Sequence, residues 1–217
     1  DKTKLIYIAN PNNPTGTFFT KAQWESFIKA VPNHIVVVLD EAYIEYAQSF
    51  LDDEFYFNGV DYVEQYKNLL VSRTFSKAYG LASLRIGYMV GNEETIQYVN
   101  QMREPFNVNH YAQVAAINAL QDQGFVEQVV QLNQAGMRQM TDVFDEMGIS
   151  YIPSIGNFIC IDLGEKALEY NQKLLEEGVI VRPIANYGMP QYLRVSIGTQ
   201  VENQYFIDAL KKVYQAN

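Results

Sequence analysis

The sequence has few of the residues that build redox and metal sites. Its 217 residues include one cysteine, Cys160, and two histidines, His34 and His110. One cysteine cannot form an intrachain disulfide, and such sparse cysteine usage favours a reducing compartment. One cysteine and two histidines are also too few for a zinc site built from these residue types, so we expect no metal.

Basic residues and long apolar runs are also scarce. Lys and Arg number 16 against 25 Asp and Glu, which gives a formal net charge of −9. A chain this acidic lacks the basic surface that binds nucleic acid or an anionic membrane. No run approaches the roughly 20 apolar residues of a membrane-spanning helix, and the run at 5–9 is too short for a signal peptide. The composition therefore predicts a soluble cytoplasmic protein without nucleic-acid or membrane partners.

Apolar runs that alternate with helical patterns predict an α/β fold. The runs lie at residues 5–9, 35–39, 69–72 and 85–90. A continuous β-branched run such as 35–39 is typical of a strand buried on both faces of a parallel sheet. Thr20 is expected to cap a helix that ends near Pro32. This alternation favours a parallel sheet with right-handed crossovers.

The second half of the chain has a different pattern. Residues 93–147 are helical in pattern, and Gly148 is expected to end this region. Strand patterns follow at 149–152, 158–163, 179–181 and 192–197, and helical patterns at 165–177 and 202–214. They predict a second, smaller α+β unit. Residues 51–66, rich in Asp, Tyr and Phe, are expected to form a surface insertion.

Four polar segments follow predicted strands or interrupt them. They are NPNNPTG at 10–16, DEAY at 40–43, SRTFSKAYG at 72–80 and LRVSIGT at 193–199. Each also has an ordinary structural interpretation: a turn, a helix cap, a solvated lysine or an internal salt bridge. In open α/β sheets, however, loops at the carboxyl ends of strands converge on a ligand-binding crevice.

The residue types in these segments suit one kind of ligand. Asp40 could pair with a buried cation, and Lys77 is a candidate nucleophile for an imine. The hydroxyls near Lys77, together with Arg85, could bind a phosphate group. Arg194 lies in an apolar strand, where a carboxylate ligand would satisfy it. Pyridoxal phosphate with an amino acid requires this combination of groups.

Taken together and in order, the four segments resemble the fold-type I pyridoxal-phosphate aminotransferases of the class I/II group. The resemblance covers essentially the whole chain. Within the group, the doubled asparagine at 12–13, DEAYIEYA at 40–47 and VIVRPIANYGMPQYLRVSIGT at 179–199 resemble the histidinol-phosphate branch. The implied fold is α/β, with part of a large domain built on a mainly parallel sheet and a small C-terminal α+β domain.

The resemblance also implies a domain organisation. Members of the family carry an N-terminal segment that this sequence lacks, so the chain is expected to be truncated and to be inactive if that segment is essential. The implied homodimer is a further expectation. The implied parts are the C-terminal part of the large cofactor-binding domain at 1–105, connecting helices at 106–147 and the small domain at 148–217.

The resemblance assigns roles toward pyridoxal phosphate. Lys77 would form the Schiff base with the cofactor, and Asp40 would pair with its protonated ring nitrogen. Asn13 and Tyr43 would hydrogen-bond its phenolic oxygen. Lys77, Asp40 and Tyr43 are the implied catalytic residues. The cofactor phosphate would be held by Thr74, Ser76 and Arg85.

The resemblance further implies substrate contacts and a reaction. Arg194 would bind the substrate α-carboxylate, Arg182 the distal anion, and Asn157 lies in a segment that approaches the substrate. The implied reaction moves an amino group between histidinol phosphate and 2-oxoglutarate or glutamate, in histidine biosynthesis. The alternatives are an aromatic amino-acid aminotransferase and a pyridoxal-phosphate-dependent decarboxylase of a phosphorylated amino acid.

Overall fold

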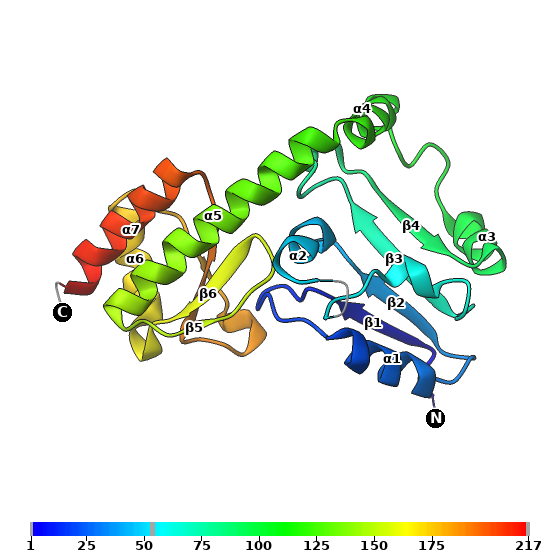
Figure 1. Cartoon of the computed structure of the whole chain (residues 1–217), viewed down its shortest axis with the longest axis horizontal. Helices are drawn as coiled ribbons and strands as arrows, with labels where there is room; N and C mark the ends of the chain where they lie inside the picture. The colour runs from blue at the N-terminus through cyan, green and yellow to red at the C-terminus, as the bar shows by residue number, and fades with distance from the viewer. Residues whose placement is uncertain (1, 53–54, 216–217) are drawn as a thin grey trace. The chain divides into compact units, whose positions relative to one another are not determined.

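The chain folds into two compact units in a computed structural model that describes residues 2–52 and 55–215 (Figure 1). Unit 1 comprises Asp1–Pro11 and Phe18–Val129. Unit 2 comprises Asn12–Thr17 and Val130–Asn217. The long helix α5 (Gln123–Met147) begins in unit 1 and ends in unit 2.

A four-stranded sheet forms the centre of unit 1. Its strands, in spatial order, are β1 (Leu5–Ala9), β2 (Val36–Asp40), β3 (Leu69–Thr74) and β4 (Gly87–Gly91). The first three are parallel, as the sequence predicts, but β4 is antiparallel to β3. The loop between β3 and β4 holds only a short 3-10 helix, η2 (Ala82–Leu84). It lacks the crossover helix that parallel neighbours usually need, so the chain returns in the opposite direction.

The helices of unit 1 begin at residues that suit helix N-termini. Thr20 caps α1 (Lys21–Ala30): its hydroxyl accepts from the Gln23 amide, and the Gln23 side chain accepts from the Thr20 amide. This confirms the predicted cap. The predicted helical region 93–147 is three helices, because it is interrupted at 103–109, around Pro105, and again at Asp122. The remaining helices are α2 (Ile44–Phe50), the 3-10 helix η1 (Gly59–Tyr62), α3 (Glu93–Met102) and α4 (His110–Gln121).

Residues 51–66 are not a surface insertion, so that prediction is wrong for the part that the structure describes. Phe57 is buried and stacks on Trp24 with ring centroids 5.0 Å apart. Tyr56 and Val63 are also buried. Buried aromatic rings remove a large apolar area from water, and this outweighs the polar composition of the segment. The acidic pair Asp53 and Glu54 lies outside the described residues.

Unit 2 contains an antiparallel sheet with two helices. Its strands, in spatial order, are β5 (Tyr151–Ile152), β6 (Phe158–Asp162), β8 (Tyr192–Ser196) and β7 (Arg182–Pro183). The helices are α6 (Ala167–Glu176) and α7 (Gln200–Gln215), with 3-10 helices η3 (Gly164–Lys166) and η4 (Ala185–Tyr187). The predicted smaller α+β unit is therefore present.

The ends of α5 and α6 in unit 2 test two predicted boundaries. Gly148 follows α5 with a φ of 66°, and the Ile149 amide donates to the Phe144 carbonyl, which confirms the predicted end. The predicted strand at 179–181 is wrong. Val179 instead completes the end of α6 by donating to the Leu174 carbonyl, and strand pairing starts at Arg182.

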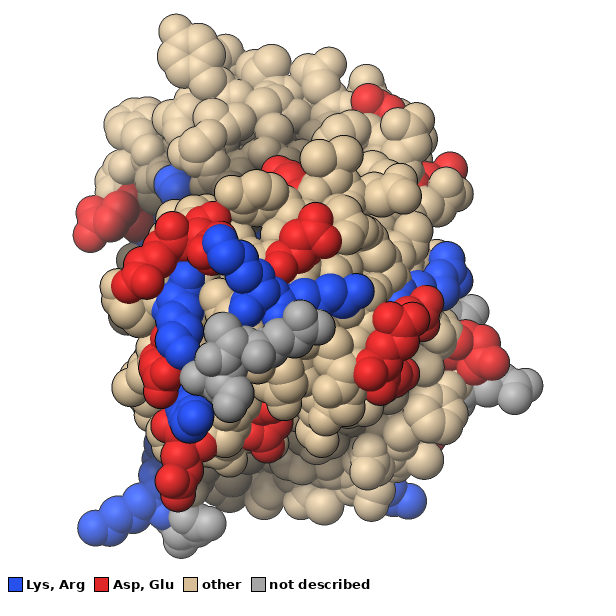
Figure 2. All heavy atoms as spheres, turned by 90° about the vertical axis from the view of Figure 1, so that its left-hand side faces the viewer, with Lys and Arg blue, Asp and Glu red and all other residues tan. Residues whose placement is uncertain are grey.

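Charges of both signs lie on the surface. Figure 2 shows Lys and Arg side chains interspersed with Asp and Glu side chains on the face that it presents. Two ion pairs of unit 2 join such charges, Lys173 to Glu169 at 2.8 Å and Lys212 to Glu177 at 2.7 Å. In the described part of the chain, no helix is both long and apolar enough to cross a membrane.

Gly16 of the NPNNPTG segment is required for a close approach within unit 2. We expect Gly16→Ala to lower the free energy of unfolding by about 2–4 kcal/mol, because the added methyl group would overlap Ser154 and φ is +76°. Gly188→Ala is the matched control, since Gly188 has the same φ and nothing within 4 Å of the added atom. It should cost about 1 kcal/mol. Equal losses in urea unfolding would contradict a steric contribution at Gly16.

Candidate active site

Asp40 and Tyr43 lie where β2 ends and α2 begins. Asp40 is the last residue of β2, opposite Ser72 of β3, and its Oδ1 accepts from the Ala42 amide at 3.1 Å. Tyr43 precedes the first residue of α2 and is 5% exposed. Parallel pairing of β2 with β3 therefore places the DEAY segment at the same sheet edge as the loop that carries Lys77.

Thr74 is the last residue of β3, and Ser76 and Arg85 lie in the loop that follows. The Ser76 amide donates to Thr74 Oγ1 at 3.0 Å. Arg85 donates from one terminal nitrogen to Ser76 Oγ at 3.2 Å and to the Ala82 carbonyl at 2.7 Å. Arg85 has a φ of 52°, which costs a residue with a side chain roughly 1–2 kcal/mol. Backbone strain of this kind is concentrated at functional sites, and the strained residue here is the one whose guanidinium contacts the Ser76 hydroxyl.

Lys77 lies against the Tyr43 ring. Its Nζ is 5.2 Å from the ring centroid, which is within the range of a cation–π contact. Among the described residues, no carboxylate forms an ion pair with Lys77 or Arg85. Two cations without a carboxylate partner and two hydroxyls beside them form a cluster of donors that suits an anion.

A buried ion pair joins the two segments of this cluster. Arg73 donates to Glu41 Oε2 from Nε at 3.0 Å and from a terminal nitrogen at 2.7 Å. Glu41 is fully buried. Burial raises the pKa of the Glu41 carboxyl, and the Arg73 guanidinium opposes that rise. Sequence reasoning gave neither residue a role, although the ends of β2 and β3 bring them together.

Asp40 has two further neighbours that the sequence analysis missed. Tyr7 of β1 donates from its hydroxyl to Asp40 Oδ2 at 3.3 Å. Burial is the largest cause that raises the pKa of Tyr7, followed by the charge of Asp40. On the other flank, Ser72 Oγ is buried and has no hydrogen-bond partner among the described residues. The strand register signals only Ser72, which lies opposite Asp40, because Tyr7 lies opposite Val38.

Arg194 and Asn13 meet within unit 2. A terminal nitrogen of Arg194 donates to Asn13 Oδ1 at 2.6 Å, and its guanidinium carbon lies 5.0 Å from the centroid of the Phe158 ring. Arg194 Nε is buried and has no hydrogen-bond partner in the described part of the chain. A buried guanidinium nitrogen without an acceptor is costly, so this arginine is suited to an anionic ligand.

Arg182 pairs with Arg194, whereas Asn157 lies further along, at the end of β8. Arg182 of β7 lies directly opposite Arg194 of β8, with its guanidinium 5.9 Å from the Tyr187 ring centroid. Two like charges at facing positions repel each other unless an anion lies near them. The Asn157 carbonyl accepts from the Ile197 amide at 2.9 Å, which ties residues 156–158 to the end of β8.

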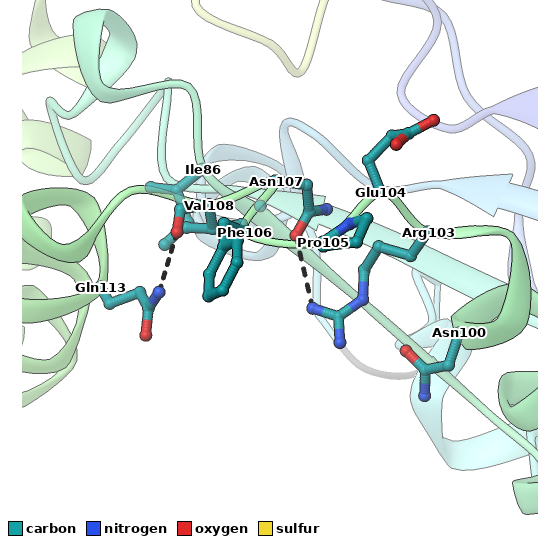
Figure 3. A pocket seen from close by; sticks show the side chains of 10 residues that line it. Ile86, Asn100, Arg103, Glu104, Pro105, Phe106, Asn107, Val108 and Gln113 are labelled. Atoms are coloured by element: carbon teal, nitrogen blue, oxygen red, sulfur yellow. Dashed lines mark hydrogen bonds between the residues drawn. The ribbon is translucent and has the colours of Figure 1, made fainter.

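A separate cavity of unit 1 holds none of the predicted site residues. It has a volume of about 470 Å³ and lies between the start of β4 and the turn from α3 to α4. Figure 3 shows Arg103 donating to Asn107 and Gln113 donating to the Val108 carbonyl along its wall. Phe106, in the same turn, is almost fully exposed.

No group of three or more His, Cys, Asp or Glu side chains that could hold a metal ion occurs within residues 2–52 and 55–215. Cys160 is buried, donates to the Pro14 carbonyl at 2.9 Å, and its pKa is raised to about 11 by burial. A thiol in that state is a poor nucleophile, so Lys77 is the strongest candidate nucleophile of the described residues.

Comparison with known proteins identifies the family. The model of the family "Aminotransferase class I and II" matches residues 1–210. The chain belongs to this family. Its mainly parallel sheet in unit 1, with the smaller α+β unit 2, is the fold-type I architecture that the sequence predicts.

Several relatives are named for one substrate. The chain is 62% identical to histidinol-phosphate aminotransferase 2 of Hydrogenovibrio crunogenus over 98% of this chain and 56% of that protein. It is 55% identical to the protein of the same name from Pseudomonas fluorescens, over 97% of this chain and 56% of that protein. The chain thus spans little more than half the length of these relatives.

A solved structure has the same fold. Histidinol-phosphate aminotransferase from Sinorhizobium meliloti, in complex with pyridoxal 5′-phosphate, aligns with a TM-score of 0.86 and 30% sequence identity. The alignment covers 98% of this chain and 58% of that one. The fold of both units is therefore that of a pyridoxal-phosphate aminotransferase.

Glu45 of α2 should make the stability of this region depend on pH. Burial raises its pKa from 4.5 to about 7, and its Oε2 has no partner in the described structure. Because the folded protein holds this proton more tightly than the unfolded chain, stability should fall as pH rises from about 4.5 to 7. Glu45→Gln should remove that loss, worth at most about 3 kcal/mol.

The measurement is urea unfolding of both proteins at pH 5 and pH 8. Glu45→Gln should gain stability relative to the unsubstituted protein at pH 8 and change little at pH 5. Glu127→Gln is the control, since Glu127 is an exposed carboxylate of the same unit. A gain at pH 8 with Glu127→Gln as well would contradict a local origin.

Proposed function

We propose that this chain is the lysine-bearing part of an aminotransferase that moves an amino group between histidinol phosphate and 2-oxoglutarate or glutamate. The observation that carries the proposal is the cluster at the carboxyl edge of the sheet in unit 1. There Lys77 contacts Tyr43, and Arg85 bonds Ser76, beside the β2 end that bears Asp40. The 62% identity to a relative named for histidinol phosphate supports the choice of substrate.

The residues present fit pyridoxal phosphate. Arg85 with the hydroxyls of Thr74 and Ser76 suits its phosphate group, because charge-assisted bonds from a guanidinium to phosphate are strong and directional. Lys77 supplies an amine close to this cluster. When bound, the cofactor supplies an aldehyde that captures amines and a ring that accepts the electron pair left on the substrate carbon.

Each residue of the chain has a defined task in this proposal. Asp40 would hold a proton on the ring nitrogen of the cofactor, while Tyr43 and Asn13 would donate to its phenolic oxygen. Lys77 Nζ would take the proton from the substrate carbon that bears the amino group. General acid–base transfer of this kind contributes roughly 10²–10⁴-fold to the rate.

Substrate recognition is assigned to unit 2. Arg194 would bind the α-carboxylate of glutamate, for which its unpartnered buried Nε provides a donor. Arg182 would bind the distal anion, which is the phosphate of histidinol phosphate or the side-chain carboxylate of glutamate. Asn157 would contact the substrate as well.

Assembly, location and domain boundaries complete the proposal. A homodimer is supported by exposed apolar side chains of unit 1. These are Tyr98, Met102, Phe106, Tyr111, Val114, Ile117 and Leu120.

A single buried cysteine supports the cytoplasm as the compartment of the protein. Residues 1–105 as part of the large domain, 106–147 as connecting helices and 148–217 as the small domain stay a prediction.

Lys77 is expected to be the attachment point of the cofactor. Borohydride reduction in the presence of pyridoxal phosphate should fix a label on the peptide that contains Lys77, and Lys77→Ala should reduce labelling to background. Lys67→Ala is the matched control, because Lys67 is an exposed lysine of the same unit. Peptide mapping by mass spectrometry gives the site, and a label on another lysine would overturn the assignment.

Arg182 should distinguish histidinol phosphate from aromatic amino donors. Arg182→Gln is expected to lower kcat/KM for histidinol phosphate by about tenfold to a hundredfold, the worth of a charge-assisted hydrogen bond, and to affect phenylalanine less. Arg138→Gln, at an exposed position of α5 within unit 2, is the control.

The same assay separates the alternatives. Formation of pyridoxamine phosphate without CO₂ is expected, whereas CO₂ release would indicate a decarboxylase. A preference for phenylalanine or tyrosine over histidinol phosphate would indicate the aromatic enzyme.

A further inference from the structure

The Glu41–Arg73 ion pair is the most buried charged feature next to the candidate cofactor residues. The Glu41 side chain is 0% exposed and that of Arg73 is 16% exposed. Both Arg73 donors to Glu41 meet Oε2, and the other carboxylate oxygen, Oε1, accepts from the Gly59 amide at 2.6 Å. Arg73 also donates to Asn58 Oδ1 at 2.7 Å. One carboxylate and one guanidinium thus connect three segments of unit 1.

The pair lies where the backbone pairing of β2 with β3 gives way. The Glu41 amide donates to the Ser72 carbonyl at 2.9 Å, one residue beyond the last paired residue of β2. After this point the chain turns into α2. Arg73 and Thr74 pair instead with Tyr88 and Gly87 of β4. The side chains of Glu41 and Arg73 therefore continue a connection that the backbone no longer makes.

The third segment, residues 58–59, lies close to the ion pair. A Cβ atom on Gly59 would lie 2.8 Å from Glu41 Oε1 and 2.5 Å from a methyl carbon of Leu39, so only glycine fits there. Asn58 caps the 3-10 helix η1 with the same side-chain oxygen that accepts from Arg73. The segment at 56–59 is anchored by its buried aromatic residues, which keeps these contacts in place.

Stability alone does not account for a charged pair at this place. Burying two charges costs desolvation energy, and apolar residues of similar volume often replace such pairs without loss of stability. What this contact adds is geometric definition, because two nitrogens of one planar guanidinium meet Glu41 Oε2 while the other carboxylate oxygen accepts from Gly59.

We propose that Glu41 and Arg73 are positioning residues that hold residues 40–43 and residues 73–77 in register at the sheet edge. The first segment carries Asp40 and Tyr43, and the second ends in Lys77. Neither member of the pair touches the reacting groups in this proposal. It rests on the proposed function in so far as these two segments serve the cofactor.

Three variants separate positioning from stability. Arg73→Lys keeps the charge but has a single nitrogen, so it loses the second of the two hydrogen bonds that Arg73 donates to Glu41 Oε2. The double variant Glu41→Gln with Arg73→Met removes both charges and leaves an acceptor for the Gly59 amide. Since no unpaired charge remains, it should fold as stably as the unsubstituted protein in urea titrations.

Asn68→Ala is the matched control. Asn68 precedes β3 and donates to the Ile35 carbonyl, just before β2, at 2.7 Å. It is 8% exposed and joins the same two strands at their opposite end. Its loss should destabilise the protein without affecting the edge that bears Lys77.

Amide hydrogen exchange of the 217-residue chain, without cofactor, is the first readout. In Arg73→Lys and in the double variant, amides of residues 40–43 and 73–77 should exchange at least tenfold faster, while Leu39 and Val71 keep their protection. Asn68→Ala should leave the two segments unchanged. Exchange equal to that of the unsubstituted protein in the double variant, or equal acceleration in Asn68→Ala, would overturn the proposal.

Uptake of pyridoxal phosphate is the second readout. The concentration of pyridoxal phosphate that half-saturates borohydride labelling of Lys77 should rise about tenfold in the double variant and stay unchanged in Asn68→Ala. Equal labelling curves would refute a positioning role even if exchange were faster. Absence of any label on Lys77 in the unsubstituted chain would refute the proposed function instead, and hydrogen exchange would still decide whether the pair holds the two segments.

Discussion

The parallel pairing of β2 with β3 is the constraint on which the candidate site in unit 1 depends. Because Asp40 lies opposite Ser72, both strands end at the same edge, and the segments that follow them must share the space beyond it. A shift of one residue would turn every side chain of a strand to the other face. The buried residues of β2 and β3, such as Leu39 and Val71, pack in one core cluster and thereby fix the register.

The sequence was informative where local chemistry decides the structure. The Thr20 cap, the end of α5 at Gly148 and the three parallel strands follow from residue preferences that act over a few positions. It was misleading where long-range contacts decide. Residues 51–66 look polar, but Phe57 finds Trp24 more than thirty positions away, and no local pattern shows that partner. The direction of β4 likewise depends on what its connecting loop contains.

The same division applies to the candidate site. Motif residues such as Lys77 and Arg85 were predictable because their types and spacing suggest a chemistry. The residues that hold them were not. Glu41 and Arg73 are 32 positions apart and meet only because the strands pair as they do. Tyr7 reaches Asp40 from a third strand. A sequence displays reactive groups more readily than it displays the groups that orient them.

The path of the chain between the units has a consequence for dissecting this protein. The chain passes from unit 1 to unit 2 after Pro11, returns after Thr17 and leaves again after Val129. The short excursion carries Asn13, which bonds Arg194, and Pro14, whose carbonyl accepts from Cys160. A single cut at residue 129 would therefore separate Arg194 from its partner and leave unit 2 without an internal piece. The two units are interleaved in sequence, so no single cut of the chain releases either of them whole.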